Sequence, residues 1–230
     1  MLRSILVLTL LCAAVAGCDR EQPAAPAASP VDVPAPDRKQ RFAWDEGAQA
    51  FTFMGQPLAA TKTWTFQDST DGFVVDGGTA ALVEPAGLRV ATSGAHLVVR
   101  SPADLHLDGS RHSLVLVRLT RIRQAGRWDG ALVWRTADHG ESVAFHTKPL
   151  RDARPQLGET MILAYDMARP KQGGEEDWVT SYVEQIRLDL DADPGGEFVI
   201  RQIAVAANPG AEALGPAPLA KAPIAASPSK

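Results

Sequence analysis

The sequence predicts an all-β domain whose antiparallel strands form a sandwich or a barrel between two disordered tails. Short runs of alternating apolar and polar residues follow one another from Gln49 to Ala206, as expected for half-buried strands. Turn-forming sequences such as Asp71-Gly72 and Pro194-Gly195-Gly196 separate the runs at a spacing of about ten residues, which is typical of these folds. Almost no stretch shows helical periodicity, so helices are expected to contribute little.

The strands are predicted from the runs with the clearest alternation. One short helix is expected near 176–182, within a polar stretch. The expected strands, in chain order, are 49–53, 62–66, 80–84, 87–92, 96–100, 113–120, 130–136, 143–148, 160–166, 182–190 and 197–205.

Alternation also assigns the faces of the middle strands. In 113–120, three apolar residues lie opposite Arg118, although Leu114 and Leu116 make this strand apolar on both sides. Because facing sheets interdigitate their apolar side chains, the apolar sets should form the core. These sets are Val115, Val117 and Leu119; Leu132 and Trp134; Val143 and Phe145; and Ile186, Leu188 and Leu190.

The first residues have the parts of a secretory signal peptide, expected over 1–17. Arg3 provides a positive charge, and the apolar run over 5–11 that follows is too short to span a bilayer. The next residues, Val15-Ala16-Gly17-Cys18, resemble the lipobox of bacterial lipoproteins. This resemblance implies cleavage before Cys18 and attachment of diacylglycerol to its thiol. An ordinary signal peptide that ends near a cysteine is the alternative.

Two further residues, Cys12 and Asp19, help to predict the cell compartment of the protein. The chain has two cysteines, and Cys12 lies in the segment expected to be removed, so neither a disulfide nor a cysteine metal site is expected. Asp19 resembles the signal that retains lipoproteins in the inner membrane. We therefore expect a periplasmic protein anchored to the inner membrane, with the outer membrane as the alternative.

Both ends of the mature chain are rich in proline and alanine. Residues 18–40 and 209–230 lack apolar periodicity, so they cannot bury enough surface to offset the entropy of ordering. We expect a lipidated linker over 18–40, a β-sandwich domain over 41–208 and a disordered tail over 209–230.

Part of the domain resembles galactose-binding-like jelly rolls, the fold of many carbohydrate-binding modules. The resemblance covers roughly 62–206 and includes an opening strand and turn, Trp64-Thr65-Phe66 with Asp71-Gly72-Phe73, and a closing hairpin over 186–205. It implies a jelly-roll sandwich that binds carbohydrate or serves as a structural appendage. Arg201 stands where the family often has an acidic residue of a structural calcium site.

The motifs of common catalytic sites are absent. The sequence has no Gly-x-Ser-x-Gly elbow, no His-Glu-x-x-His helix, no phosphate-binding loop and no Gly-x-Gly-x-x-Gly turn. Its five histidines lack a recurrent ligand spacing. Two carboxylates distant in sequence can still meet as a hydrolytic pair, but the sequence favours a non-catalytic protein.

Acidic loops raise the question of a structural calcium ion, the one cofactor considered. Calcium takes six to eight oxygen ligands from such loops. Aspartates also form good turns without any metal, which is the alternative. The acidic groups are Asp68, Asp71 and Asp76 after one strand, and Asp189, Asp191 and Asp193 near the end.

Basic residues concentrate in the predicted strands, whereas acidic residues concentrate in the turns. If these strands are neighbours, they form a cationic face suited to anionic groups. The alternatives are that the arginines cover the sheet and pair with acids, that a jelly roll separates them onto two sheets, and that the tryptophans pack in the core. The candidate ligand-binding residues are Arg118, Arg135, His146, Lys148, Trp128 and Trp178.

These observations predict a non-catalytic, membrane-tethered envelope lipoprotein that binds glycan, including anionic glycan, as an accessory to polysaccharide assembly or export. A structural lipoprotein that docks another envelope protein is the second hypothesis, and an envelope hydrolase is the third. Nucleic acid is not an expected partner, because the net charge is −4 and the compartment is extracytoplasmic.

The lipid anchor gives the first testable prediction. Cys18→Ser should abolish labelling by a fatty-acid analogue and leave the protein unprocessed or released from membranes, because the acylated thiol is lost. Normal processing and unchanged membrane fractionation of this variant would contradict it.

Overall fold

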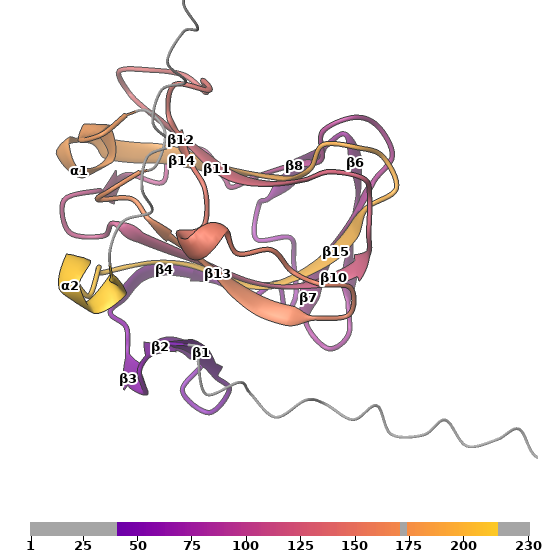
Figure 1. The fold of residues 1–230 in the computed structure, drawn as a ribbon, viewed down its shortest axis with the longest axis horizontal. Coiled ribbons are helices and arrows are strands. Elements are labelled where there is room, and N and C mark those ends of the chain that lie inside the picture. Colours follow the sequence, from indigo (N-terminus) through magenta and orange to yellow (C-terminus); the bar gives the residue numbers. More distant parts are fainter. Residues whose placement is uncertain (1–40, 171–173, 216–230) are drawn as a thin grey trace, which may run out of the picture. The chain divides into compact units, whose positions relative to one another are not determined.

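The computed structural model describes residues 41–170 and 174–215, in which nearly all regular structure is antiparallel strand. Two larger sheets face each other and a small three-stranded sheet lies against one of them (Figure 1). This confirms the predicted antiparallel β-sandwich. The signal peptide 1–17 and the linker 18–40, including Cys18, lie outside the described residues. No helix in the described ranges is long and apolar enough to cross a membrane.

The first sheet is built around its last strand, β15 (Glu197–Ala206). β10 pairs with β15 along its length, while β7 and β4 pair with its first and second halves on the other edge. The strand order is β13 (Thr160–Asp166), β10 (Leu114–Arg123), β15, β7 (Gly87–Thr92) and β6 (Gly78–Val83), with β4 (Ala60–Trp64) beside β15.

The second sheet is centred on β14 (Tyr182–Asp191). β11 pairs with one edge of β14, and β8 and β9 pair with the other. The strand order is β12 (His146–Thr147), β11 (Trp128–Thr136), β14, β8 (Val98–Arg100) and β5 (Val74–Asp76), with β9 (Leu107–Asp108) beside β14.

The core between the sheets consists of the alternating apolar residues of both. Val115, Val117 and Leu119 of β10 face Leu132, Trp134 and the Ile186, Leu188 and Leu190 set of the second sheet. The buried Tyr165 hydroxyl has a partner in this core, since it donates to the Gly130 carbonyl at 3.2 Å. The predicted core is confirmed, except for Val143.

A second apolar cluster explains why β10 is apolar on both sides. Leu114 and Leu116 point away from the main core and pack beneath a small sheet and a short helix. The small sheet is formed by β1 (Phe42–Asp45), β2 (Ala50–Phe53) and β3 (Gln56–Pro57), and the helix is α2 (Ala211–Leu214). Helix α2 begins within the predicted tail 209–230 and buries Leu214, so the domain extends to at least residue 215.

Most predicted strands occur within a few residues of their expected bounds, and 87–92 and 160–166 match them.

The expected helix is α1 (Asp177–Thr180), and η1 (Leu150–Asp152) is a further short turn. The expected strand 143–148 was wrong in extent, because only His146–Thr147 pairs with β11, at the sheet edge. Val143 is 81% exposed in the preceding loop.

One buried ion pair joins the two sheets at the end of the sandwich. Arg121 of β10 donates to the Asp191 carboxylate of β14 at 3.0 Å, with side-chain exposures of 3% and 0%. The Arg121 guanidinium lies 5.7 Å from the Trp128 ring and 5.5 Å from the Phe198 ring. Burial raises the pKa of the Asp191 carboxyl despite the nearby arginine.

This pair gives a stability prediction. Asp191→Ala should lower the free energy of unfolding by about 3–5 kcal/mol, because it leaves a buried guanidinium without its carboxylate. The double variant Arg121→Met with Asp191→Leu should be much less destabilised, since no buried charge remains. Urea unfolding of the three proteins tests this, and equal losses in both variants would contradict it.

Candidate functional site

The outer face of the second sheet places two arginines side by side. The register pairs Arg187 of β14 with Arg100 of β8 on one side and with Val133 of β11 on the other. Like charges directly opposite each other in a sheet are destabilising. The arrangement therefore depends on carboxylates supplied from the same face.

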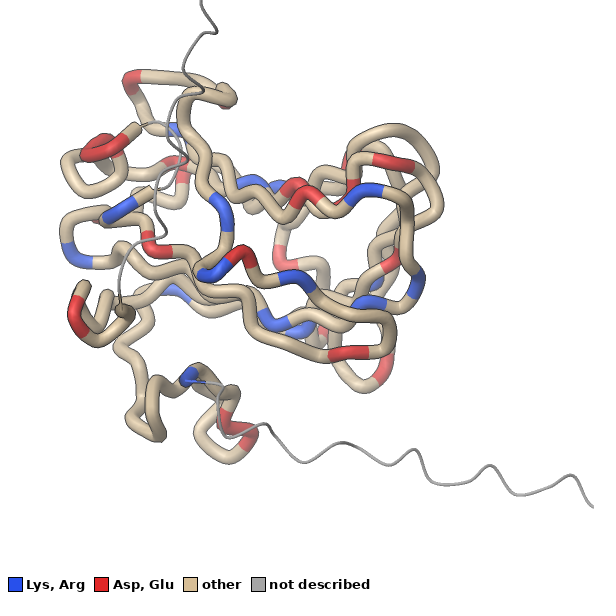
Figure 2. Tube along the Cα trace, viewed as in Figure 1, with Lys and Arg blue, Asp and Glu red and all other residues tan. Residues whose placement is uncertain are grey.

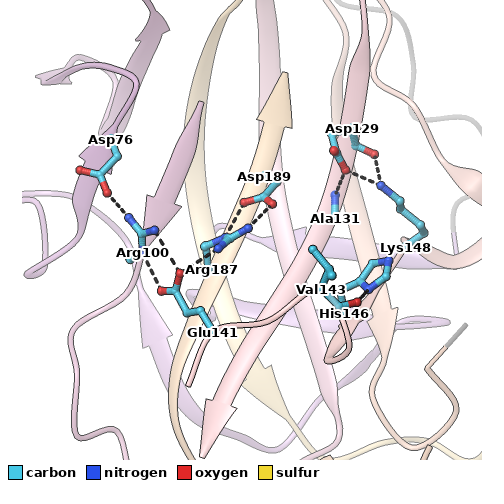
Figure 3. A network of polar contacts seen from close by, with 10 residues as sticks. All are labelled: Asp76, Arg100, Asp129, Ala131, Glu141, Val143, His146, Lys148, Arg187 and Asp189. Carbon is cyan, nitrogen blue, oxygen red and sulfur yellow. Dashed lines mark hydrogen bonds and ion pairs between the residues drawn. The ribbon is translucent and has the colours of Figure 1, made fainter. Parts of the chain in front are cut away.

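Three carboxylates surround these two guanidinium groups (Figure 3). Asp189 accepts the Nε and Nη2 groups of Arg187 at 2.7 and 2.6 Å. Asp76 of β5 pairs with Nη1 of Arg100. Glu141 lies between the two arginines and accepts Nε and Nη2 of Arg100 at 2.6 and 3.0 Å and Nη1 of Arg187 at 2.8 Å.

Glu141 differs from the other members because it comes from a loop. The 137–145 loop joins β11 to β12 and brings Glu141 over the neighbouring strands. The loop is attached near its ends: His139 Nε2 lies 2.9 Å from the Asp177 carboxylate, and its ring stacks on Phe145 at 3.5 Å. Ser142, Val143 and Ala144 beside Glu141 are exposed.

Hydrogen bonds between Glu141 and the two arginines shift the pKa of each of these three groups so that its charged form is favoured. Burial raises the pKa of the Glu141 carboxyl, but hydrogen bonds from Arg100 and Arg187 outweigh this, and the net pKa lies below the ordinary value. The pKa of Arg187 is raised by its hydrogen bonds to Asp189 and then to Glu141. The pKa of Arg100 is raised mainly by its hydrogen bond to Glu141.

A polar pocket of about 350 Å³ lies at the β11–β12 edge of the same sheet. Trp128 is half-buried there, with its ring 5.7 Å from that of Phe198. Lys148 pairs with the Asp129 carboxylate and donates to the Asp129 carbonyl at 3.1 Å. The lining residues are Trp128, Asp129, Lys148, Pro149, Asp152, Ala153 and Arg154.

A smaller apolar pocket, of about 150 Å³, lies beside the second apolar cluster. Phe42, Met161 and Leu214 contribute apolar surface, and Arg41 and Arg151 supply its charged groups. Arg41 donates to the Ala213 carbonyl at 2.7 Å, which ties β1 to α2.

The predicted cationic face of Arg118, Arg135 and His146 is not formed. Arg118 belongs to the first sheet, where it donates to Glu46 at 2.9 Å and Gln202 at 3.0 Å. Arg135 and His146 belong to the second sheet, with Lys148 just beyond it. The separation arises because β10 and β11, although consecutive, lie in opposite sheets. Figure 2 shows basic and acidic residues close together along the second sheet, and ion pairs join them.

Trp178, one of the candidate ligand-binding residues, packs in the core, which was the alternative given for the tryptophans. Its side chain is fully buried, its indole lies 5.8 Å from that of Trp134, and Nε1 donates to the His112 carbonyl at 2.9 Å. Acidic neighbours in the sequence suggested a surface position, but α1 turns this ring into the core. Trp128 remains a candidate because it lines the polar pocket.

The acidic residues considered as possible calcium ligands do not come together in one site. Asp71 accepts the amides of Thr65 and Phe66 at 3.1 and 2.9 Å, as a turn-forming aspartate does. Asp76 pairs with Arg100, and Asp189 and Asp191 of the second acidic run pair with arginines. Within 41–170 and 174–215, no group of three His, Cys, Asp or Glu residues is placed to hold a metal ion, so Asp68, Asp71 and Asp76 are not a metal cluster.

No protein-family model and no curated protein matches this sequence. Among solved structures, the CBM22-1–GH10 modules of Clostridium thermocellum endo-1,4-β-D-xylanase 10B have a TM-score of 0.46 and 15% identity. That match covers 66% of this chain and 29% of the xylanase chain, so this chain spans less than a third of its length. The CBM22-1 xylan-binding domain of Paenibacillus barcinonensis Xyn10C has a TM-score of 0.46 and 11% identity, over 66% and 98% of the two chains. The family 29 carbohydrate-binding module CBM29_1 of Piromyces equi has a TM-score of 0.42 and 9% identity, over 65% and 88%.

The depressed pKa of Glu141 gives a pH prediction. Its ionised form is favoured by folding, so its contribution to stability is present above about pH 4.5, the ordinary value, and is lost as pH falls through the lower folded pKa. Glu141→Gln should lower Tm by about 1–3 °C at neutral pH, because the ion pairs of Glu141 with Arg100 and Arg187 are partly exposed to solvent. The difference should shrink below about pH 4.5.

Thermal scans of the wild type and Glu141→Gln between acidic and neutral pH measure this difference. Glu212→Gln, an exposed glutamate on α2, is the matched control. A Glu141→Gln effect that is constant with pH would contradict the prediction.

Proposed function

We propose that this chain is a non-catalytic glycan-binding protein tethered to the cell envelope through Cys18, and that the second sheet carries its binding site. The polar pocket beside Trp128 is the observation that carries this proposal. It combines one aromatic ring with charged side chains from Asp129, Lys148, Asp152 and Arg154 in a single hollow.

The size and lining of this pocket suit a sugar residue. Its volume of about 350 Å³ falls at the lower end of the range for small-molecule sites. A ring face can cover the apolar side of a pyranose, while carboxylate and ammonium groups exchange hydrogen bonds with its hydroxyls. The Lys148–Asp129 pair offers a donor and an acceptor at one position.

Backbone strain at the wall of the pocket supports the same assignment. Arg151 and Asp152 have φ angles of 60° and 50°, a region that costs free energy for residues other than glycine. Such strain concentrates at ligand-binding sites, where the surrounding structure holds it in place. Here it positions η1 between the polar and the apolar pockets.

Tethering is supported by the lipobox resemblance at Val15-Ala16-Gly17-Cys18 and by the composition of 18–40. We propose the periplasmic face of the inner membrane from Asp19, with the outer membrane as the alternative. An extended proline-rich linker would let the sandwich reach polymers above the bilayer. This arrangement suits an accessory to polysaccharide assembly or export.

A glycan array probed with the mature chain tests the proposed activity. Arg154→Ala should weaken binding about tenfold, because an exposed arginine that lines the pocket can give a charge-assisted hydrogen bond to the ligand. Tm should change little, since an exposed side chain seldom contributes much to folding. Arg127→Ala is the matched control, because Arg127 is exposed next to Trp128 but does not line the pocket.

Folded protein that binds no glycan would overturn this proposal and favour the docking of another envelope protein. Turnover of nitrophenyl glycosides or esters would instead favour the hydrolase hypothesis. Equal weakening by Arg154→Ala and Arg127→Ala would place the glycan outside this pocket.

A further inference from the structure

We infer that Arg100 and Arg187 form a binding site for the carboxylate of an acidic sugar, and that Glu141 occupies this site until the ligand displaces it. This inference rests on the proposed glycan binding and adds the ligand class and a built-in competitor. The two arginines lie on β8 and β14 of the second sheet, and Glu141 lies in the loop between β11 and β12 (Figure 3).

The first argument is the convergence of donors on one carboxylate. Nε and Nη2 of Arg100 and Nη1 of Arg187 reach the Glu141 oxygens at 2.6, 3.0 and 2.8 Å. The two N–H groups from Arg100 form the fork that matches a planar carboxylate. A uronate carboxylate has the same shape and charge as that of Glu141, so it can accept the same hydrogen bonds.

The second argument is that the arginines stay in place without Glu141. Arg187 gives its other edge to Asp189, and Arg100 gives its remaining terminal nitrogen to Asp76. Removal of Glu141 therefore leaves two positioned guanidinium groups whose free N–H donors face one point. Their charges would be balanced by Asp76 and Asp189, and an incoming carboxylate would restore the charge that Glu141 supplied.

The third argument is that Glu141 is the residue of this network whose side chain can move away from the arginines. Asp76, Asp189 and both arginines are held in strands, whereas Glu141 lies in the 137–145 loop. Gly140 beside it is exposed, with open space where a β-carbon would lie, and Ser142 to Ala144 are exposed. The contacts of His139 and Phe145 keep the ends of the loop attached while its tip moves away.

Titration calorimetry with trigalacturonate and its methyl ester tests the inference. Glu141→Ala in the mature chain should bind trigalacturonate about tenfold more tightly than wild type, because the competitor for the site is gone. Binding of the uncharged methyl ester should not change. Adding Arg187→Lys should remove the gain, since lysine keeps the charge but loses the fork.

Proteolysis of the wild type gives a second measurement without a substitution. A glutamate-specific protease should cleave after Glu141 faster when trigalacturonate is present, because the displaced side chain becomes accessible. The methyl ester should have no such effect.

For the calorimetry, Glu212→Ala serves as the matched control, since this exposed residue lies on α2.

An unchanged or lower affinity of folded Glu141→Ala for trigalacturonate would overturn the inference, as would protection of Glu141 from cleavage by the ligand. If the inference fails in this way but neutral oligosaccharides still bind, and Arg154→Ala weakens their binding, the proposed glycan function stands. If no saccharide binds the wild type or Glu141→Ala, both are overturned.

Discussion

Burial of both faces of β10 is the constraint on which the rest of the arrangement depends. A strand of an antiparallel sheet normally has one apolar face and one solvated face. Here Val115 and Val117 fill the space between the sheets, while Leu114 and Leu116 point the other way and would be exposed without the small sheet and α2. The domain therefore needs chain segments on both sides of the sandwich, and Phe51 and Phe53 of β2 and Leu214 of α2 supply that cover.

The consequence is a division of roles between the outer faces of the two sheets. On the first sheet, Arg118 is held by Glu46 at the edge of the covering segment and serves packing. On the second sheet, the corresponding positions carry Arg187 and Arg100, whose closeness is tolerated because Asp76, Asp189 and Glu141 surround them. The same residue type thus pairs with the covering segment on one face and, in our proposal, binds a ligand on the other.

Local patterns in the sequence were sufficient for the strands and the core but not for the site. Alternation placed 87–92 and 160–166 correctly because each strand has one face in the main core. The strands that lie next to each other in a sheet depend on the topology of the fold. The sequence around Arg100 and Arg187 therefore did not predict that these two residues are neighbours. Alternation did place Arg187 outward. Nothing local showed that Trp178 turns inward, or that Glu141, just before the strand expected over 143–148, reaches across to β8 and β14.

The contrast between two arginine–carboxylate pairs shows why one is structural and the other can exchange its partner. Arg121 is enclosed by Trp128 and Phe198 and meets Asp191 where neither charge can reach water, so separation of the pair would leave both charges buried. Arg187 and Glu141 keep side-chain exposures of 19% and 21%, so water or another anion can replace Glu141. Ion pairs with access to solvent add little stability. Stability alone is therefore a weak reason to gather five charged groups on this face, whereas recognition of a carboxylate requires paired, positioned guanidinium groups of this kind.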